Sequence, residues 1–178
     1  IPLRLVGSEM CIRDSYDGAI AAYSTIGAES PYYSSARVRQ AWALNSKGQT
    51  DEAIAVLRNL AAGTQSSESL IALADLLRSK ERYGEAIQEY SRALALVAPP
   101  QQRHWSIFYS RAIAYDRSKQ WPKAEADFLK ALELQPDQPL VLNYLGYSWI
   151  DRGENLHRAR AMVEKAVELR PNEGFIVD

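Results

Sequence analysis

The chain has 178 residues, of which 47% are hydrophobic and 24% charged, a balance typical of a globular protein. Its 21 Lys and Arg residues nearly match its 22 Asp and Glu residues, so the net charge of −1 gives no general attraction to nucleic acid or to an anionic membrane. No segment contains the run of about 18 apolar residues that a membrane-spanning helix needs. The single cysteine, Cys11, excludes an intramolecular disulfide. We therefore expect neither nucleic acid binding nor membrane insertion.

Residues 1–15 differ from the remainder of the chain. The string IPLRLVGSEMCIRDS has no helical period, and it lacks the apolar run and the cleavage site of a secretory signal. It resembles adaptor-derived sequence at the ends of environmental gene fragments, so we interpret it as a non-native leader. A native disordered leader is the alternative. On both interpretations Cys11 has no functional weight.

Four later stretches repeat one helical pattern. Each has a small residue, a large apolar residue four positions later, and a further small or apolar residue three after that. This i, i+4, i+7 spacing marks one face of an α-helix. The three positions are filled by Ala53, Leu57 and Leu60, by Ala86, Tyr90 and Ala93, by Ala124, Phe128 and Ala131, and by Ala159, Val163 and Ala166.

A second helical stretch precedes each of these, with a small residue followed three positions later by a large one. These pairs are Ala41 and Leu44, Ala74 and Leu77, Ala112 and Tyr115, and Gly146 and Trp149. The small residues lie 12 or 13 positions before their alanine partners, so each pair of stretches predicts an antiparallel hairpin whose backbones approach closely. All prolines except Pro2 fall at the proposed helix boundaries, and Gly48 and Gly153 fall in turns, where a left-handed residue is useful.

This pattern resembles the tetratricopeptide repeat, a helix pair of about 34 residues. The stretch VLNYLGYSWIDRGENLHRARAMVEKAVELRPN matches it best, and IFYSRAIAYDRSKQWPKAEADFLKALELQP is nearly as similar. The sequence departs from the family pattern at Arg111, where leucine is usual, and by one extra residue near Asn155. A longer linker around Pro99 to His104 also stretches the spacing.

The resemblance implies an all-α fold, an α-α superhelix (solenoid) of stacked antiparallel helix pairs. The expected segments are the second helix of a truncated repeat at 16–30, repeats at 34–66, 67–104 (with an extended linker), 105–138 and 139–172, and the start of a truncated further repeat at 173–178. We interpret the chain as a fragment of a longer array, which could self-associate through exposed end repeats.

The resemblance also implies a concave groove, lined by the first helix of each repeat, that binds a peptide or a segment of a partner protein. The groove residues that we predict are Arg39, Trp42, Ile71, Asp75, Tyr109, Ile113, Asn143 and Tyr147. Arg78, Asp116, Tyr144 and Ile150 fall on the same face. The alternative is that these side chains contact neighbouring repeats. Asp75 argues against a clamp for a C-terminal carboxylate, because it would repel that group.

The sequence shows no pattern of catalytic or metal-binding residues. His104 and His157 are interpreted as exposed surface residues, with no ligand at metal-binding spacing beside them. Glu125 and Asp127 are interpreted as favourable charges at a helix start. No nucleophile elbow or phosphate-binding loop occurs. We therefore expect a chain that is not an enzyme and needs no cofactor or metal.

Two other functions compete with the interaction scaffold. The chain could be the regulatory or substrate-recruiting arm of a larger enzyme, which the full-length sequence would decide. A helical-repeat RNA binder would need a basic groove, but Asp75, Asp116 and Asp151 interrupt the basic residues on this face. The stretch LNYLGYSWIDRGENL resembles bacterial repeat proteins, which favours a bacterial source and the cell envelope or periplasm over the cytoplasm.

Overall fold

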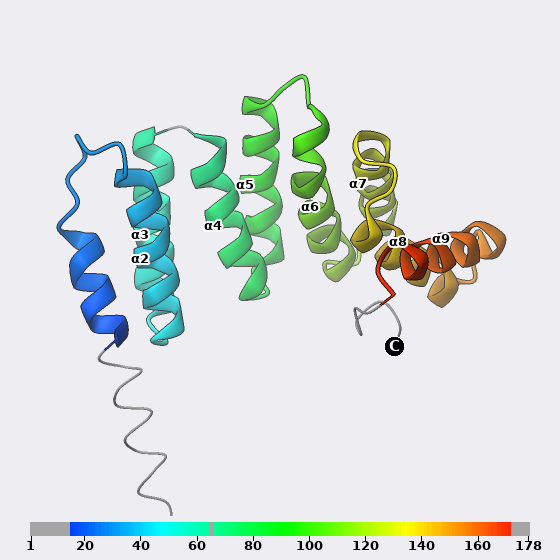
Figure 1. Cartoon of the computed structure of the whole chain (residues 1–178), viewed down its shortest axis with the longest axis horizontal. Helices are drawn as coiled ribbons and strands as arrows, with labels where there is room; N and C mark the ends of the chain where they lie inside the picture. Colours follow the sequence, from blue (N-terminus) through cyan, green and yellow to red (C-terminus); the bar gives the residue numbers. More distant parts are fainter. Residues whose placement is uncertain (1–14, 65, 172–178) are drawn as a thin grey trace, which may run out of the picture. The chain divides into compact units, whose positions relative to one another are not determined.

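The computed structural model describes residues 15–64 and 66–171. Most of the predicted leader and the predicted start of a further repeat therefore lie outside the described residues. A helix over residues 15–24 comes first. It is followed by α2 (Tyr33–Ser46), α3 (Thr50–Thr64), α4 (Ser67–Ser79), α5 (Tyr83–Leu96), the short 3₁₀ helix η1 (Gln102–His104), α6 (Trp105–Arg117), α7 (Trp121–Leu134), α8 (Pro139–Arg152) and α9 (Leu156–Leu169). Figure 1 shows these helices in chain order.

The helix ends follow the local chemistry of the sequence. Ser66 caps α4, since its side chain accepts a hydrogen bond from the backbone N–H of Ser69 at 3.2 Å. Gly48 and Gly153 have φ values of 92° and 68°, which confirms the left-handed turns predicted at these positions. Asn155, beside the extra residue of the last turn, also has a positive φ of 46°. Asparagine tolerates this conformation better than most residues.

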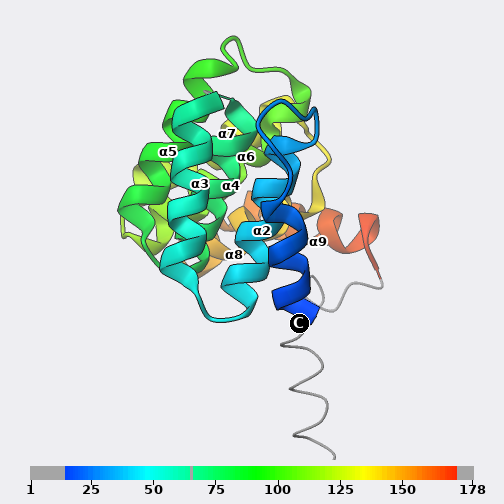
Figure 2. The same ribbon diagram turned by 90° about the vertical axis from the view of Figure 1, so that its left-hand side faces the viewer.

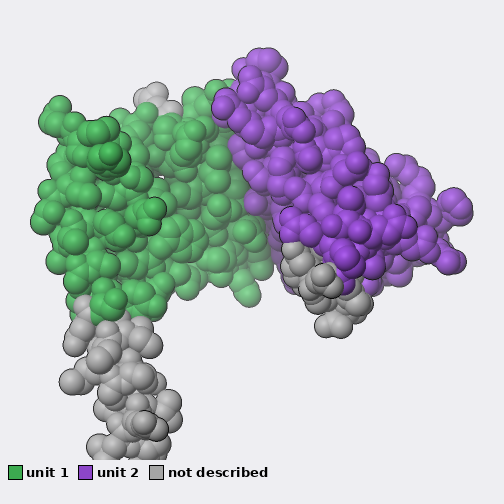
Figure 3. All heavy atoms as spheres, viewed as in Figure 1, with its two compact units in different colours: residues 1–96 green, residues 97–178 purple. Residues whose placement is uncertain are grey.

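The chain forms two compact units, residues 1–96 and residues 97–178 (Figure 3). In the first unit α2 packs against α3 and α4 packs against α5, and Figure 2 shows α2 and α3 close together. In the second unit the pairs are α6 with α7 and α8 with α9. Successive pairs stack within each unit, through α3 and α4 and through α7 and α8. The predicted all-α class of stacked antiparallel helix pairs is confirmed.

Small residues lie at every contact between paired helices. The alanines at these positions have no exposed surface: Ala41, Ala53, Ala74, Ala86, Ala112, Ala124 and Ala159. In the last pair the partner of Ala159 is Gly146. A Cβ atom added to Gly146 would lie 2.7 Å from Cγ2 of Val163 and 3.0 Å from the carbonyl oxygen of Ala159. The close backbone approach predicted from the sequence is therefore present.

Large apolar side chains fill the space around these contacts. Leu57, Leu73 and Leu77 are buried in the first unit, and Phe128 and Trp149 in the second. The polar atom of Trp149 is also satisfied, because its Nε1 donates to Oε1 of Glu125 at 2.7 Å. Burial and hydrogen bonding together fix the orientation of the helix pairs within each unit.

Glu125 and Asp127 have a different role from the one predicted. Asp127 is buried within α7 and accepts hydrogen bonds from Nε and Nη2 of Arg111 at 2.7 and 2.8 Å. The residue that departs from the family pattern, Arg111, thus has a partner of opposite charge on the paired helix. Since Glu125 binds Trp149, both carboxylates stabilise interhelical contacts, and the interpretation as helix-start charges is wrong.

The prediction of an exposed His104 is also wrong. His104 ends η1 and is 8% exposed. Its Nδ1 accepts a hydrogen bond from the backbone N–H of Gln101 at 2.9 Å, which closes the turn before α6. The sequence pattern did not show that η1 packs against α7 as well as against the adjoining α6. His157 is exposed, as predicted.

Replacing Gly146 with alanine should lower the free energy of unfolding by about 1–3 kcal/mol, because the added methyl has no space against Val163 and Ala159. Gly84→Ala is the matched control, since a Cβ at Gly84 would meet nothing within 4 Å. That change should be neutral or stabilise by up to about 1 kcal/mol. Urea unfolding followed by circular dichroism measures both, and an unaffected Gly146→Ala protein would contradict the packing described.

Arg111→Leu should lower the free energy of unfolding by about 3 kcal/mol, because it leaves the buried carboxylate of Asp127 without its cation. A second change, Asp127→Ala, should restore much of that loss in the double variant, since no buried charge then remains. The same unfolding measurement compares the two. A double variant less stable than Arg111→Leu alone by a further 1 kcal/mol or so would show that the pair is not the reason for the loss.

Candidate functional site

The second unit has an open cleft between the C-terminal end of α6 and one face of α8. Its volume is about 290 Å³. Its lining residues are Asp116 and Arg117 from α6 and Asn143, Tyr144, Tyr147, Ser148, Asp151 and Arg152 from α8. The cleft thus combines aromatic, amide, hydroxyl and charged side chains on the first helices of two successive pairs.

The spacing of residues along α8 separates the cleft from the core. Asn143, Tyr147 and Asp151 are four residues apart and therefore share one face of the helix. Leu145 and Trp149, which lie on the opposite side, are buried in the core. Tyr147 is 38% exposed, and the core makes no use of its ring. Tyr147 and Asp151 are accordingly available for contacts with another molecule.

Tyr144 joins the cleft to the aromatic cluster beneath it. Its ring centroid lies 5.0 Å from that of Phe128 and 6.2 Å from that of Tyr109, which meets it edge to face. Its hydroxyl donates to Oδ2 of Asp116 at 3.1 Å. Burial and the neighbouring Asp116 charge raise the pKa of Tyr144 to about 12, so the phenol stays protonated and remains a donor at neutral pH.

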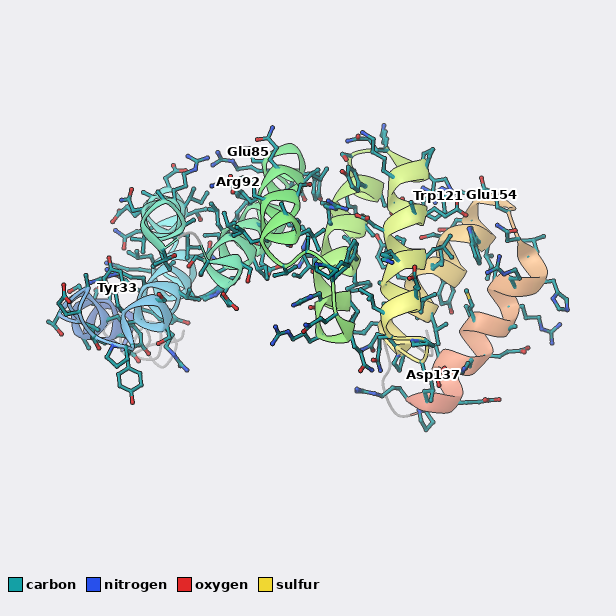
Figure 4. The ribbon with its side chains drawn as sticks, turned by 90° about the horizontal axis from the view of Figure 1, so that it is seen from above. Tyr33, Glu85, Arg92, Trp121, Asp137 and Glu154 are labelled. Atoms are coloured by element: carbon teal, nitrogen blue, oxygen red, sulfur yellow. The ribbon has the colours of Figure 1, made fainter. Side chains whose placement is uncertain are left out.

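Arg152 holds the charged end of the cleft in place. Its Nη2 donates to Oδ1 of Asp116 at 2.7 Å, and its guanidinium carbon lies 3.9 Å from the centre of the Trp121 ring. Trp121 in turn donates from Nε1 to Oε2 of Glu154 at 3.0 Å, and these two residues lie close together in Figure 4. Both oxygens of Asp116 are therefore used by Tyr144 and Arg152, and its charge is compensated within the protein.

Two charged side chains of the cleft are not compensated in this way. Arg117 and Asp151 are exposed, and neither forms an ion pair with any other residue in the described part of the chain. Arg117 ends α6, and Asp151 lies one residue before the end of α8. The two walls of the cleft thus carry opposite charges that are available to a ligand.

The predicted groove residues of the second unit fall in two groups. Asn143 and Tyr147 line the cleft. Tyr109 and Ile113 are half-buried and pack against the aromatic and aliphatic core below it. For these two the alternative interpretation, a contact with neighbouring structure, describes their surroundings better. They support the cleft and do not line it.

The predicted groove residues of the first unit differ in exposure. Arg39 is exposed and Trp42 is 39% exposed on α2, whereas Ile71 and Asp75 on α4 are half-buried. Asp75 accepts a hydrogen bond from the hydroxyl of the buried Tyr90 at 2.6 Å. Much of its hydrogen-bonding capacity is therefore used inside its own helix pair.

Three residues that line the cleft were not among the predicted site residues: Arg117, Ser148 and Arg152. The signal was nevertheless available. Ser148 and Arg152 follow Tyr144 at four-residue intervals, so the face predicted from Tyr144 continues to the end of α8. Arg117 follows Ile113 by four residues on α6. What the spacing could not show is that Arg152 pairs with Asp116, which lies 36 residues earlier.

Within residues 15–64 and 66–171, no helix combines the length and the apolar character required to cross a membrane. In the same residues no three His, Cys, Asp or Glu side chains gather closely enough to hold a metal ion.

Comparison with known proteins gives a family match over most of the chain. A family profile described as tetratricopeptide repeat matches residues 38–103, 71–139 and 109–174. The TPR repeat-containing protein PA4667 of Pseudomonas aeruginosa is 25% identical over 164 residues, which is 90% of this chain but only 27% of that protein. The chain therefore spans about a quarter of the length of this relative.

Two solved structures share the fold at low sequence identity. MamA from Desulfovibrio magneticus is 19% identical with a TM-score of 0.72, covering 96% of this chain and 94% of that one. PilF from Pseudomonas aeruginosa is 18% identical with a TM-score of 0.68, covering 90% and 78%. These likenesses show that the fold is shared.

Arg152→Ala should lower the free energy of unfolding by about 2 kcal/mol, because it removes a charge-assisted hydrogen bond to Asp116 and the contact with the Trp121 ring. Arg160→Ala is the control, since Arg160 is 82% exposed in its pair with Glu164 and should be replaceable without measurable loss. Thermal and urea unfolding of both variants test this. Equal stability of the two would mean that Arg152 does not organise the cleft.

Proposed function

Because this chain belongs to the tetratricopeptide repeat family, a domain type that generally serves as a protein-interaction module, we propose that the cleft between α6 and α8 binds a short segment of a partner protein. The proposal rests on the exposed side chains of the cleft, Tyr147, Arg117 and Asp151, which lie outside the core and are open to solvent. A surface built in this way can vary its contacts with a partner while the helix pairs remain intact.

Tyr147 is the principal anchor in this proposal. A partly exposed tyrosine offers a large contact area with few rotatable bonds, and aromatic residues often dominate the energy of protein interfaces. Asn143 lies one turn before it on α8, but its Oδ1 is buried. The exposed ring of Tyr147 therefore suits a ligand that has an apolar side chain.

The surroundings of the anchor favour binding because they are already ordered. Tyr144 is fixed by Asp116 and by the rings of Tyr109 and Phe128, and Arg152 is fixed by Asp116 and Trp121. A ligand would therefore not have to immobilise these side chains, which lowers the entropic cost of association. A cleft of this size accommodates only a few side chains of the partner, so we expect a short linear segment and not a large rigid interface.

A displayed library of random peptides, selected against the purified chain, tests the proposal. Synthetic versions of the selected peptides should bind Tyr147→Ala at least tenfold more weakly than wild type, a loss of about 1.4 kcal/mol. Tyr32→Ala is the matched control, because Tyr32 is a 71% exposed tyrosine in the first unit. Fluorescence polarisation measures the affinities.

Two results would reject this assignment of the site. One is a set of peptides whose affinity for Tyr147→Ala equals that for wild type. The other is an equal loss in the Tyr32→Ala and Tyr147→Ala proteins, which would indicate nonspecific adhesion to exposed rings. Circular dichroism of both variants checks that each remains folded.

A further inference from the structure

We infer that the segment bound in the cleft carries both charges, with an acidic side chain facing Arg117 and a basic side chain facing Asp151. The inference rests on the proposed function and adds the chemical class of the partner. It depends on which of the four charges lining the cleft remain available to a ligand.

Two of the four charges, Asp116 and Arg152, form an ion pair within the cleft wall and are called the inner pair. Their contact at 2.7 Å is supported by the Tyr144 hydroxyl on one side and by the Trp121 ring on the other. The side chains of Arg152 and Asp116 are only 32% and 16% exposed. A ligand charge that displaced either partner would leave the other partly buried and uncompensated, which is costly. The inner pair is thus part of the cleft wall and does not select for charge.

The other two charges, Arg117 and Asp151, are exposed and are called the outer charges. They line the same cleft from opposite walls, yet they form an ion pair neither with each other nor with any other described residue. Because both are solvated, a ligand can reach each of them without first breaking a contact. Opposite charges on facing walls are complementary to a ligand that carries opposite charges on its two sides.

Singly charged ligands fit the cleft less well. An acidic segment would be attracted by Arg117 but repelled by Asp151, and the two effects would largely cancel. A row of nucleic acid phosphates meets the same repulsion. The carbonyl ends of α6 and α8 also lie at this end of the cleft, and their partial negative charge adds to the charge of Asp151. A basic group beside Asp151 is therefore favoured by both charges. An acidic group beside Arg117 is favoured because the full positive charge of the guanidinium exceeds the partial negative charge at the end of α6.

The position of Tyr147 indicates where an uncharged side chain of the ligand lies relative to its basic group. It precedes Asp151 by one helical turn on the same face of α8. A side chain that packs on Tyr147 would therefore lie close to the basic group that meets Asp151. The expected segment has an uncharged, apolar or aromatic residue near a Lys or Arg, with an Asp or Glu directed toward the wall formed by α6.

Random dodecapeptides displayed on phage can be selected against four proteins to test this inference. The proteins are wild type, Asp151→Lys, Arg117→Glu and Arg160→Glu. The last is the control, because it reverses a charge outside the cleft. Peptides selected by wild type and by the control should contain both an acidic and a basic residue. Peptides selected by Asp151→Lys should replace the basic residue with an acidic one, and those selected by Arg117→Glu should make the opposite change.

Synthetic peptides convert this selection into affinities. At low ionic strength, where exposed charges are weakly screened, the wild-type peptide should bind Asp151→Lys at least fivefold more weakly than it binds wild type. Reversing the basic residue of the peptide should restore the affinity for that variant. Both sites are exposed, so the variants should remain folded, which circular dichroism verifies.

The possible outcomes separate this inference from the proposed function. Peptides that depend on Tyr147 but show no charge preference, or whose affinity ignores both reversals, overturn the inference and leave the proposed function standing. If no selected peptide is sensitive to Tyr147→Ala, both fail. A swap of the selected charge in Asp151→Lys and Arg117→Glu, but not in Arg160→Glu, supports both.

Discussion

The close approach of two backbones inside each helix pair is the constraint on which the rest of the structure depends. Alanine or glycine lies on both sides of that contact in all four described pairs, and these alanines have no exposed surface. At Gly146 even a methyl group has no space. Once the approach is fixed, large side chains such as Tyr90 and Trp149 fill the gaps around it at normal packing density. The face of each first helix turned away from its partner is then not needed for this packing.

The candidate site uses that remaining face, and polar contacts give it a definite shape. On α8 the core takes Leu145 and Trp149, while Tyr147 and Asp151 remain for the cleft. Arg152 connects the two groups, because it compensates the charge of Asp116 and packs on Trp121. The result separates stability from recognition. Charges compensated within the protein hold the wall, and uncompensated charges at its edge are available to set the preference for a partner.

The sequence predicts the helix pairs well because the signals involved are local and repeated. Alanine and glycine at regular intervals, together with prolines at boundaries, predict both the helices and their antiparallel pairing. Features that depend on one distant partner could not be predicted in this way. His104 looked exposed because η1 packs against the distant helix α7 only in the folded chain. Asp127 looked like a helix-start charge because its partner Arg111, 16 residues earlier, comes close only when the helices pack. The sequence predicted which helix face carries the groove residues. Spacing alone could not show that Tyr109 supports the cleft while Tyr147 lines it.

If the small residues act by permitting close backbone approach, a valine scan followed by urea unfolding should separate the buried alanines from exposed ones. The buried positions are Ala41, Ala74 and Ala112, and the exposed helical references are Ala55, Ala95 and Ala126. Valine lowers helix propensity by roughly 0.5 kcal/mol at any of these positions, so the difference between the two sets isolates the effect of packing. Each buried substitution should lower the free energy of unfolding by about 2 kcal/mol more than the exposed references do. Equal losses in the two sets would show that close backbone approach is not what the small residues provide.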